Sequence, residues 1–128
     1  MKEIITSARG PKPAGPYSPA VRANGMVFVS GQIALDPQTG KLAEGGIQAE
    51  TARVLENLKM VLEAAGLSLA DVVKTTVFLK DLAEFGQMNE LYAKYFGATP
   101  PARSTVEVAR LPRDCRIEME AIAADSRS

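Results

Sequence analysis

The chain has 128 residues, of which 46% are apolar and 23% charged, the balance of one globular domain expected to span residues 1–128. Fifteen basic residues match fifteen acidic ones, so no net field favours nucleic acid or an anionic membrane surface. There is no histidine and only one cysteine, Cys115, which excludes Ser-His-Asp and Cys-His catalysis, histidine-ligated metals and thiolate clusters. Because membrane-length apolar runs, a signal-peptide core and phosphate-binding glycine loops are also absent, we expect a cytoplasmic protein without metal or cofactor.

The first half of the chain predicts three strands followed by a helix. Residues 2–6 suit a short edge strand, and a proline-rich loop follows. Asn24-Gly25 between two apolar runs predicts a hairpin, because both turn residues tolerate positive φ, and Ser30-Gly31-Gln32 ends its second strand. Apolar residues at helical spacing predict a helix over 47–65, which Gly66 stops.

The second half predicts a strand, a helix and two more strands. Residues 72–80 are rich in β-branched side chains, which favour a strand. Asp81 then caps a helix that Gly97 ends, with an apolar stripe made of Leu82, Phe85, Met88, Tyr92, Tyr95 and Phe96. Strands are expected at 102–109 and 116–123. The order β-β-β-α-β-α-β-β predicts an α+β fold in which two helices cover one face of the sheet and leave the other to solvent or another subunit.

The last two strands are interpreted as a hairpin. Pairing their ends around the turn places Arg103 and Glu120 as diagonal neighbours on the face away from the helices. The planar fork of an arginine suits a carboxylate, and a glutamate can orient a water or shuttle a proton. An ordinary surface or interface ion pair is the alternative interpretation of the same pattern.

Seven short motifs are spread along the chain: GPYS at 15–18, SGQI at 30–33, EAAGL at 63–67, VKTTVFLKDL at 73–82, PARSTV at 101–106, VARLP at 108–112 and IEMEAIA at 117–123. Together they closely resemble the RidA (YjgF) reactive-intermediate deaminase family, in the family's order and over essentially the whole chain. The resemblance implies a chorismate-mutase-like α+β fold with a six-stranded, mostly antiparallel sheet. It also implies a homotrimer with the sheets lining its centre and active sites between subunits, where 2-imino acids are hydrolysed to 2-keto acids and ammonia without a cofactor.

Position by position, the resemblance implies roles for seven residues. Arg103 would grip the substrate carboxylate, Glu120 would position the attacking water and move protons, and Tyr17 would close the pocket. The remaining residues expected to line the pocket are Ser30, Gly31, Asn89 and Thr105. Many relatives carry cysteine where this chain has Thr105, which questions any role for a thiol.

Two rival functions stay open at this point. One is an endoribonuclease that inhibits translation, against which zero net charge, the lack of histidine and the few aromatic residues all argue. The other is a regulatory or holdase-like protein that binds a small ligand in the same clefts. Each pocket residue also has a structural interpretation: Tyr17 could anchor its loop, Ser30-Gly31 could end a strand, and Asn89 could face solvent.

Overall fold

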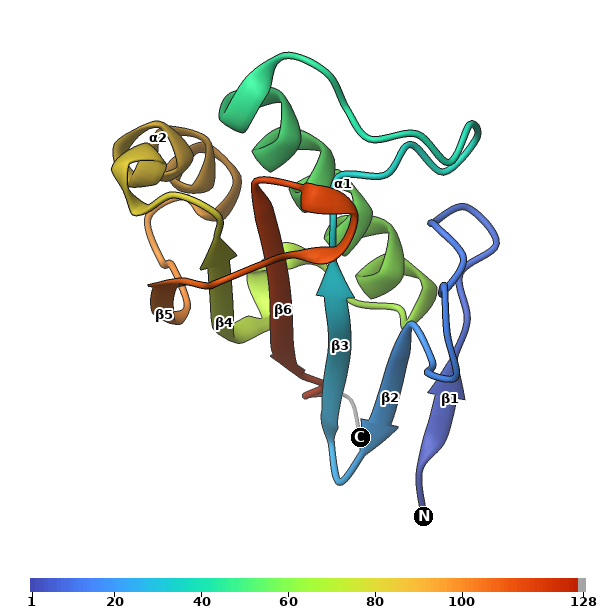
Figure 1. Cartoon of the computed structure of the whole chain (residues 1–128). Helices are drawn as coiled ribbons and strands as arrows, with labels where there is room; N and C mark the ends of the chain where they lie inside the picture. Colours follow the sequence, from blue (N-terminus) through green and yellow to red (C-terminus); the bar gives the residue numbers. More distant parts are fainter. Residues whose placement is uncertain (127–128) are drawn as a thin grey trace.

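The computed structural model describes residues 1–126 and contains six strands and two α-helices (Figure 1). In chain order they are β1 (Glu3–Ile5), β2 (Ala20–Ala23), β3 (Met26–Gln32), α1 (Gly46–Ala64), β4 (Val72–Leu79), α2 (Phe85–Phe96), β5 (Ala102–Glu107) and β6 (Ile117–Ala124). Short 3₁₀ turns precede β4, α2 and β6. The predicted order β-β-β-α-β-α-β-β is confirmed.

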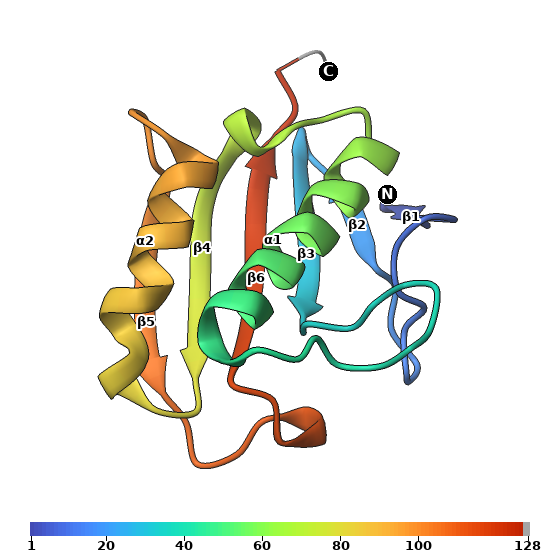
Figure 2. The same cartoon turned by 90° about the horizontal axis from the view of Figure 1, so that it is seen from above.

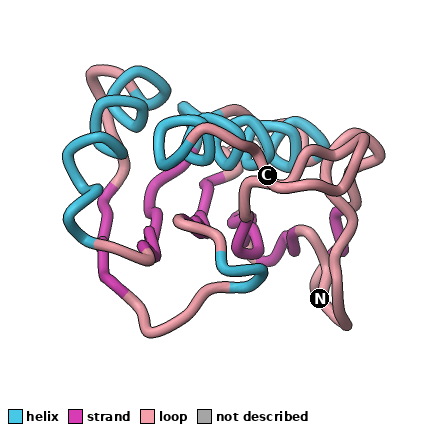
Figure 3. Tube along the Cα trace, turned by 45° about the horizontal axis from the view of Figure 1, so that its top comes forward, coloured by secondary structure: helices cyan, strands magenta, loops and turns pink. Residues whose placement is uncertain are grey.

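The six strands form one sheet in the order β1-β2-β3-β6-β4-β5. Every neighbouring pair is antiparallel except β4 and β5, which run parallel. Both helices lie on the same side of this sheet, α1 across β3 and β6 and α2 beside β4 and β5 (Figure 2). Figure 3 shows the two layers, helices over strands. The predicted six-stranded, mostly antiparallel sheet with one helix-covered face is confirmed.

Local turn chemistry explains why these elements begin and end where they do. Asn24 and Gly25 both have positive φ, 52° and 73°, and Ala23 pairs with Met26, as the predicted hairpin requires. Gly66 follows α1 in the left-handed region, and the N–H of Leu67 donates to Leu62 O at 2.9 Å. The sequence therefore specifies both the first hairpin and the end of the long helix.

The core lies between the helices and one face of the sheet. The predicted apolar stripe of α1 is buried throughout, and it packs against Ile117, Met119 and Ala121 of β6 among others. In α2, Met88, Tyr92 and Phe96 are buried as predicted. Leu82 and Phe85 were expected on the same stripe but are exposed: Leu82 lies in the 3₁₀ turn before α2, and Phe85 is the first residue of the helix.

The predicted hairpin of the last two strands is wrong. Strand β4 lies between β5 and β6, and its Thr75 pairs with Arg103 on one side and with Ala121 on the other. The segment β4-α2-β5 is a strand-helix-strand unit, and its helix returns the chain parallel to the strand that it left. Because directly paired residues share a face, Arg103 lies on the helix-covered face while Glu120 lies on the opposite face. The two side chains are not neighbours.

The face of the sheet without helices, here called the open face, is partly apolar. Phe28 of β3 and Val106 of β5 are 45% and 44% exposed, and the register places Phe78 and Ile122 on the same face. Contiguous exposed apolar side chains on a soluble domain mark interaction surfaces. Among residues 1–126, no helix has both the length and the apolar character to cross a membrane.

Candidate active site

Arg103 of β5 lies over two aromatic rings on the helix-covered face. Its guanidinium carbon lies 4.6 Å from the ring centroid of Tyr92 and 5.4 Å from that of Phe85. The Tyr92 hydroxyl is anchored in turn by a 2.6 Å hydrogen bond with buried Thr75. Burial raises the pKa of Tyr92, so its ring supports the guanidinium as a neutral phenol. No carboxylate within residues 1–126 pairs with Arg103, so its fork is available for an anionic ligand.

Two of the other predicted pocket residues lie near Arg103. Asn89 lines the same pocket, of about 460 Å³, and Thr105 lies two residues further along β5. The Oδ1 atom of Asn89 and the Oγ1 atom of Thr105 are buried, and neither has a hydrogen-bond partner among the residues described. Buried oxygens without partners are unusual in native proteins and are typical of functional sites. We call Arg103, Tyr92, Asn89 and Thr105 the cationic half-site.

A second pocket, of about 350 Å³, lies between the proline-rich loop and the end of β3. Prolines form much of its wall, and its polar groups include Tyr17, Arg113 and Glu118. Glu118 of β6 was not predicted as a site residue, whereas the predicted Glu120 is exposed on the same strand and does not line this pocket. We call Glu118, Gly31 and Tyr17 the acidic half-site.

The Glu118 carboxylate rests against Gly31. A Cβ atom at position 31 would collide with the carboxylate where it now lies, so a larger residue there would force the Glu118 side chain to move. Burial, and then the neighbouring charge of Glu120, raise the pKa of Glu118. A carboxyl group whose pKa is raised in a pocket holds a proton more readily than a free one, which suits it to accept and return protons.

Tyr17 and Ser30 shape the loop around this pocket. Tyr17 is 51% exposed, and its hydroxyl accepts a 3.3 Å hydrogen bond from the N–H of Ala14. The hydroxyl of Ser30 donates to Ser18 O at 2.6 Å, and the N–H of Ser30 donates to Pro19 O. The side chain of Ser30 therefore ties the loop to β3 and is already engaged, while Tyr17 stands at the open side of the pocket.

Within one chain the two half-sites are separated. The cationic half-site belongs to β5 and α2 on the helix-covered face, whereas Glu118 projects from β6 on the open face, with β4 in between. Side chains on opposite faces of a sheet point apart, so one small molecule cannot contact Arg103 and Glu118 of the same chain. A site that uses both half-sites needs two copies of the chain.

Glu118 and Tyr92 belong to the two half-sites but were not among the predicted site residues. Because side chains alternate along β6, Glu118 and Glu120 lie on the same face, and the sequence pattern does not distinguish them. The structure distinguishes them, because only Glu118 lies beside Gly31. Tyr92 was predicted only as a core residue, and its contact with Arg103 follows from the strand-helix-strand unit. No group of three His, Cys, Asp or Glu side chains that could hold a metal ion occurs within residues 1–126. That the protein works without a metal or cofactor stays a prediction.

Comparisons with known proteins identify the family of the chain. The family model described as Endoribonuclease L-PSP matches residues 7–125. A RutC family protein of Pyrococcus horikoshii is 56% identical over 123 residues, covering 96% of this chain and 98% of the relative. A mouse protein named 2-iminobutanoate/2-iminopropanoate deaminase is 45% identical, with 96% and 91% covered. The crystal structure of E. coli TdcF with bound serine has a TM-score of 0.92 at 46% identity and covers 97% and 99% of the two chains. The chain belongs to the RidA/YjgF family, as the resemblance of its motifs implied.

Proposed function

We propose that this protein hydrolyses reactive 2-enamine and 2-imino acids, such as 2-iminobutanoate and 2-iminopropanoate, to 2-keto acids and ammonia. The observation that carries the proposal is the pair of complementary half-sites: an arginine with no ion-pair partner, and a partly buried carboxyl group with a raised pKa. The first suits the carboxylate of the substrate and the second suits its C=N group. The name of the mouse relative supports this substrate class.

The assembly that we propose is a homotrimer whose sheets line the centre, with each site formed between two subunits. The partly apolar open face gives the subunits a surface to bury. In such a ring, the cationic half-site of one subunit meets the acidic half-site of its neighbour. This arrangement resolves the separation of Arg103 and Glu118 within one chain.

In the proposed reaction the cationic half-site holds the substrate. Arg103 binds the carboxylate through two parallel hydrogen bonds. The rings of Phe85 and Tyr92 keep its guanidinium group in place before the substrate arrives. Asn89 and Thr105 lie close enough along α2 and β5 to contact the same substrate end, where their unpartnered oxygens gain hydrogen bonds. This half-site provides orientation and no chemical step.

The acidic half-site provides proton transfer. An enamine first tautomerises to the imine, whose nitrogen takes a proton from solvent. Water then adds to C2 and gives up one proton, and the amine nitrogen is protonated. The carbon–nitrogen bond breaks as the C2 hydroxyl returns its proton to solvent, which leaves the keto acid and ammonia. Ionised Glu118 accepts a proton from the attacking water and returns it to the departing nitrogen, so we assign to it the role first expected of Glu120. Gly31 gives the carboxylate its place, Ser30 holds the loop, and Tyr17 closes the pocket.

Mixing two inactive variants tests both the chemistry and the divided site. Arg103→Ala and Glu118→Gln are each purified, unfolded together in equal amounts and refolded. Random assembly of subunits gives about one quarter of the sites two intact halves, so about a quarter of the wild-type turnover of 2-iminobutanoate should return. Each variant refolded alone is the control. If the mixture stays as inactive as its components, the site is not shared between subunits.

A ligand-binding protein is the second candidate, and the relative with bound serine favours it. The same arginine would bind a stable amino acid or keto acid, with no turnover. Calorimetry with serine and an assay with freshly generated 2-iminobutanoate separate the two: binding without turnover supports the second candidate. Cleavage of RNA by the pure protein, lost in Arg103→Ala, would instead support the endoribonuclease after which the family model is named. The cytoplasmic location expected from the sequence stays a prediction.

A further inference from the structure

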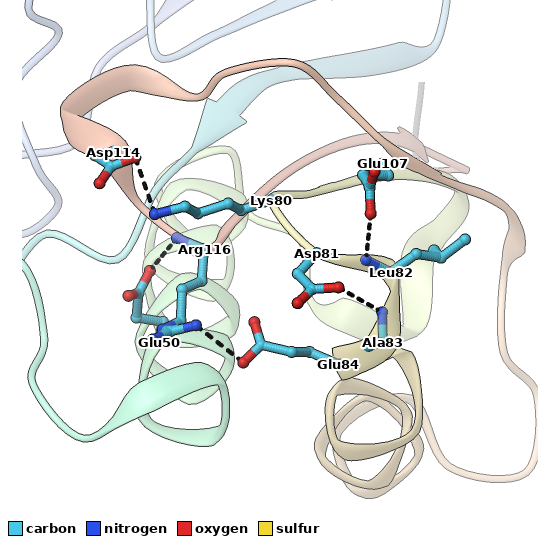
Figure 4. A network of polar contacts seen from close by, with 9 residues as sticks. All are labelled: Glu50, Lys80, Asp81, Leu82, Ala83, Glu84, Glu107, Asp114 and Arg116. Carbon is cyan, nitrogen blue, oxygen red and sulfur yellow. Dashed lines mark hydrogen bonds and ion pairs between the residues drawn. The ribbon is translucent and has the colours of Figure 1, made fainter.

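A buried carboxylate on α1 holds the start of β6. Glu50 is only 7% exposed, and its Oε1 atom accepts a 2.9 Å hydrogen bond from the backbone N–H of Arg116 (Figure 4). Burying a carboxylate is costly unless it is paired or hydrogen-bonded, so this contact is a specific feature and not an incidental one. It joins the long helix directly to the residue before β6.

Arg116 is restrained at two further points. Its carbonyl oxygen accepts from the N–H of Lys80 at 2.9 Å, and its guanidinium Nη1 donates to Glu84 Oε2 at 3.0 Å (Figure 4). The ammonium of Lys80 also pairs with Asp114 at 3.0 Å in the preceding turn. Together these contacts fix the backbone at the point where it enters β6, two residues before Glu118.

The turn before β6 needs such restraint. Arg113 and Asp114 both have positive φ, 59° and 54°, which is an uncommon conformation for side chains other than glycine. Arg113 also lines the pocket that contains Glu118. A shift of this turn would therefore move one wall of the pocket and the strand that carries the carboxylate at the same time.

We propose that Glu50 is a positioning residue for Glu118, and that its hydrogen bond to the Arg116 N–H keeps the Glu118 carboxylate in place beside Gly31. The inference rests on the function proposed above. A displacement of about 1 Å at a reacting group can cost as much as ~10²-fold in rate, so a contact this close to the carboxylate affects turnover more than substrate binding.

The kinetic test compares Glu50→Ala with Glu50→Gln on 2-iminobutanoate generated in situ. Both variants remove the charge, but glutamine keeps an acceptor oxygen and nearly the same volume, so a difference between them reports the hydrogen bond together with the packing of this buried side chain. We expect Glu50→Ala to lower kcat by ~10–100-fold with KM within about two-fold, and Glu50→Gln to stay within about three-fold of wild type. Glu63→Gln, an exposed carboxylate on the same helix, is the matched control. Equal losses in the alanine and glutamine variants would overturn the proposal.

A titration without substrate separates this proposal from the proposed function. The side-chain carboxyl of Glu118 is followed by ¹³C NMR in each variant. The charged and titratable groups around it are Glu120 on the same strand, Arg113 in the turn, and Lys12 and Tyr17 in the proline-rich loop. If Glu118 loosens into solvent, its pKa falls further towards the ordinary value in Glu50→Ala than in Glu50→Gln.

The outcomes of the titration are distinct from those of the kinetics. An identical Glu118 titration in the alanine and glutamine variants would refute positioning, whatever the activity. A shift confined to the alanine variant, together with full turnover by Glu118→Gln, would support positioning and refute the proposed function. If Glu50→Ala does not fold, Glu50→Asp replaces it: aspartate keeps the charge but is one methylene too short to reach the Arg116 N–H. It should shift the Glu118 titration and lower kcat in the same direction, and a wild-type result would count against positioning.

Discussion

The cationic and acidic half-sites are built in different ways. Arg103 stands on a regular strand, and its guanidinium lies over the ring of Tyr92, which is itself hydrogen-bonded to Thr75, so its position depends on packed elements. Glu118 also stands on a strand, but its surroundings are a proline-rich loop and a turn with positive φ. In the proposed reaction, substrate orientation would therefore depend on the packed core of the fold, while proton transfer would depend on loops that hydrogen bonds hold in place.

The largest expected effect separates the two glutamates of β6. Glu118→Gln should lower kcat by roughly 10²–10⁴-fold, because the amide cannot accept a proton from water, with little change in KM. Glu120→Gln is the matched control and should stay within about three-fold of wild type, since Glu120 is exposed outside the pocket. Steady-state kinetics on an imino acid generated in situ measure both. Loss of turnover in the Glu120 variant alone would return the catalytic role to the residue first predicted.

Removing the other half-site should affect binding more than the chemical step. Arg103→Ala leaves the substrate carboxylate unpaired in a cleft, at a cost of ~2–5 kcal/mol of binding free energy, seen mainly as a rise in KM. Arg103→Lys should rescue little, because an ammonium lacks the planar fork. Circular dichroism provides the folding control. An arginine variant with normal KM would show that this half-site does not hold the substrate.

A charge on the open face should separate the half-sites by separating the subunits. Phe28 is 45% exposed in one chain, and Phe28→Asp places a carboxylate where subunits would pack. We expect light scattering at micromolar concentration to give a trimer for the wild type and a monomer for the variant, with turnover lost alongside. Leu82→Asp, equally exposed but outside the sheet, is the control. A wild-type protein that stays monomeric would remove the basis for a shared site.

Thr105 provides a smaller test of the cationic half-site. Its buried hydroxyl oxygen has no partner among the described residues, so Thr105→Val removes no protein hydrogen bond and should leave the melting temperature unchanged or slightly higher. If the hydroxyl contacts the substrate, KM should rise by about three- to ten-fold, the loss of one hydrogen bond. Thr105→Cys should remain active, because the proposed reaction uses no thiol. Unchanged KM in the valine variant would exclude Thr105 from substrate binding.

The smallest expected effect is on stability: Glu118→Gln should lower activity but slightly raise the melting temperature. Because the folded-state pKa of Glu118 is raised, ionising it destabilises the folded chain, and this penalty is present at pH values above its folded pKa. Glu118→Gln should therefore melt slightly higher than wild type at pH 7. The difference should vanish as the pH falls below the ordinary glutamate value of about 4.3, where both states are protonated. A lower melting temperature at pH 7 would show that the carboxylate is stabilised by contacts that we have not identified.

Local patterns predicted the elements of this fold and its first hairpin, but they did not predict how β5 and β6 would pair. The Asn24-Gly25 turn and the Gly66 stop act within a few residues and were correct. The β5–β6 hairpin failed because closeness along the chain was taken for pairing, although the helix between β4 and β5 favours a parallel return. The polar sequence of β5 is also typical of an edge strand, and the alternate burial of β6 suits a central one.

The candidate site was predicted only in part, because local motifs are visible in the sequence while the pairing of strands is not. Arg103, Asn89, Tyr17 and Gly31 all line pockets, because the motifs that carry them were recognisable in the sequence. Glu120 was assigned from a pattern with period two, which places Glu118 and Glu120 on the same face but cannot say which of them lies beside Gly31. That choice depends on the irregular pairing between β3 and β6 near Gly31, which the sequence does not reveal.

The separation of Arg103 and Glu118 on opposite faces of one sheet has a consequence for how activity responds to concentration. If neither half works alone, specific activity per chain should fall on dilution below the dissociation constant of the assembly, as mass action requires. Because substrate binds only where two chains meet, it should also draw dilute subunits together. Substrate binding would then stabilise the assembled protein, so the fraction of chains in active assemblies would rise as the substrate accumulates.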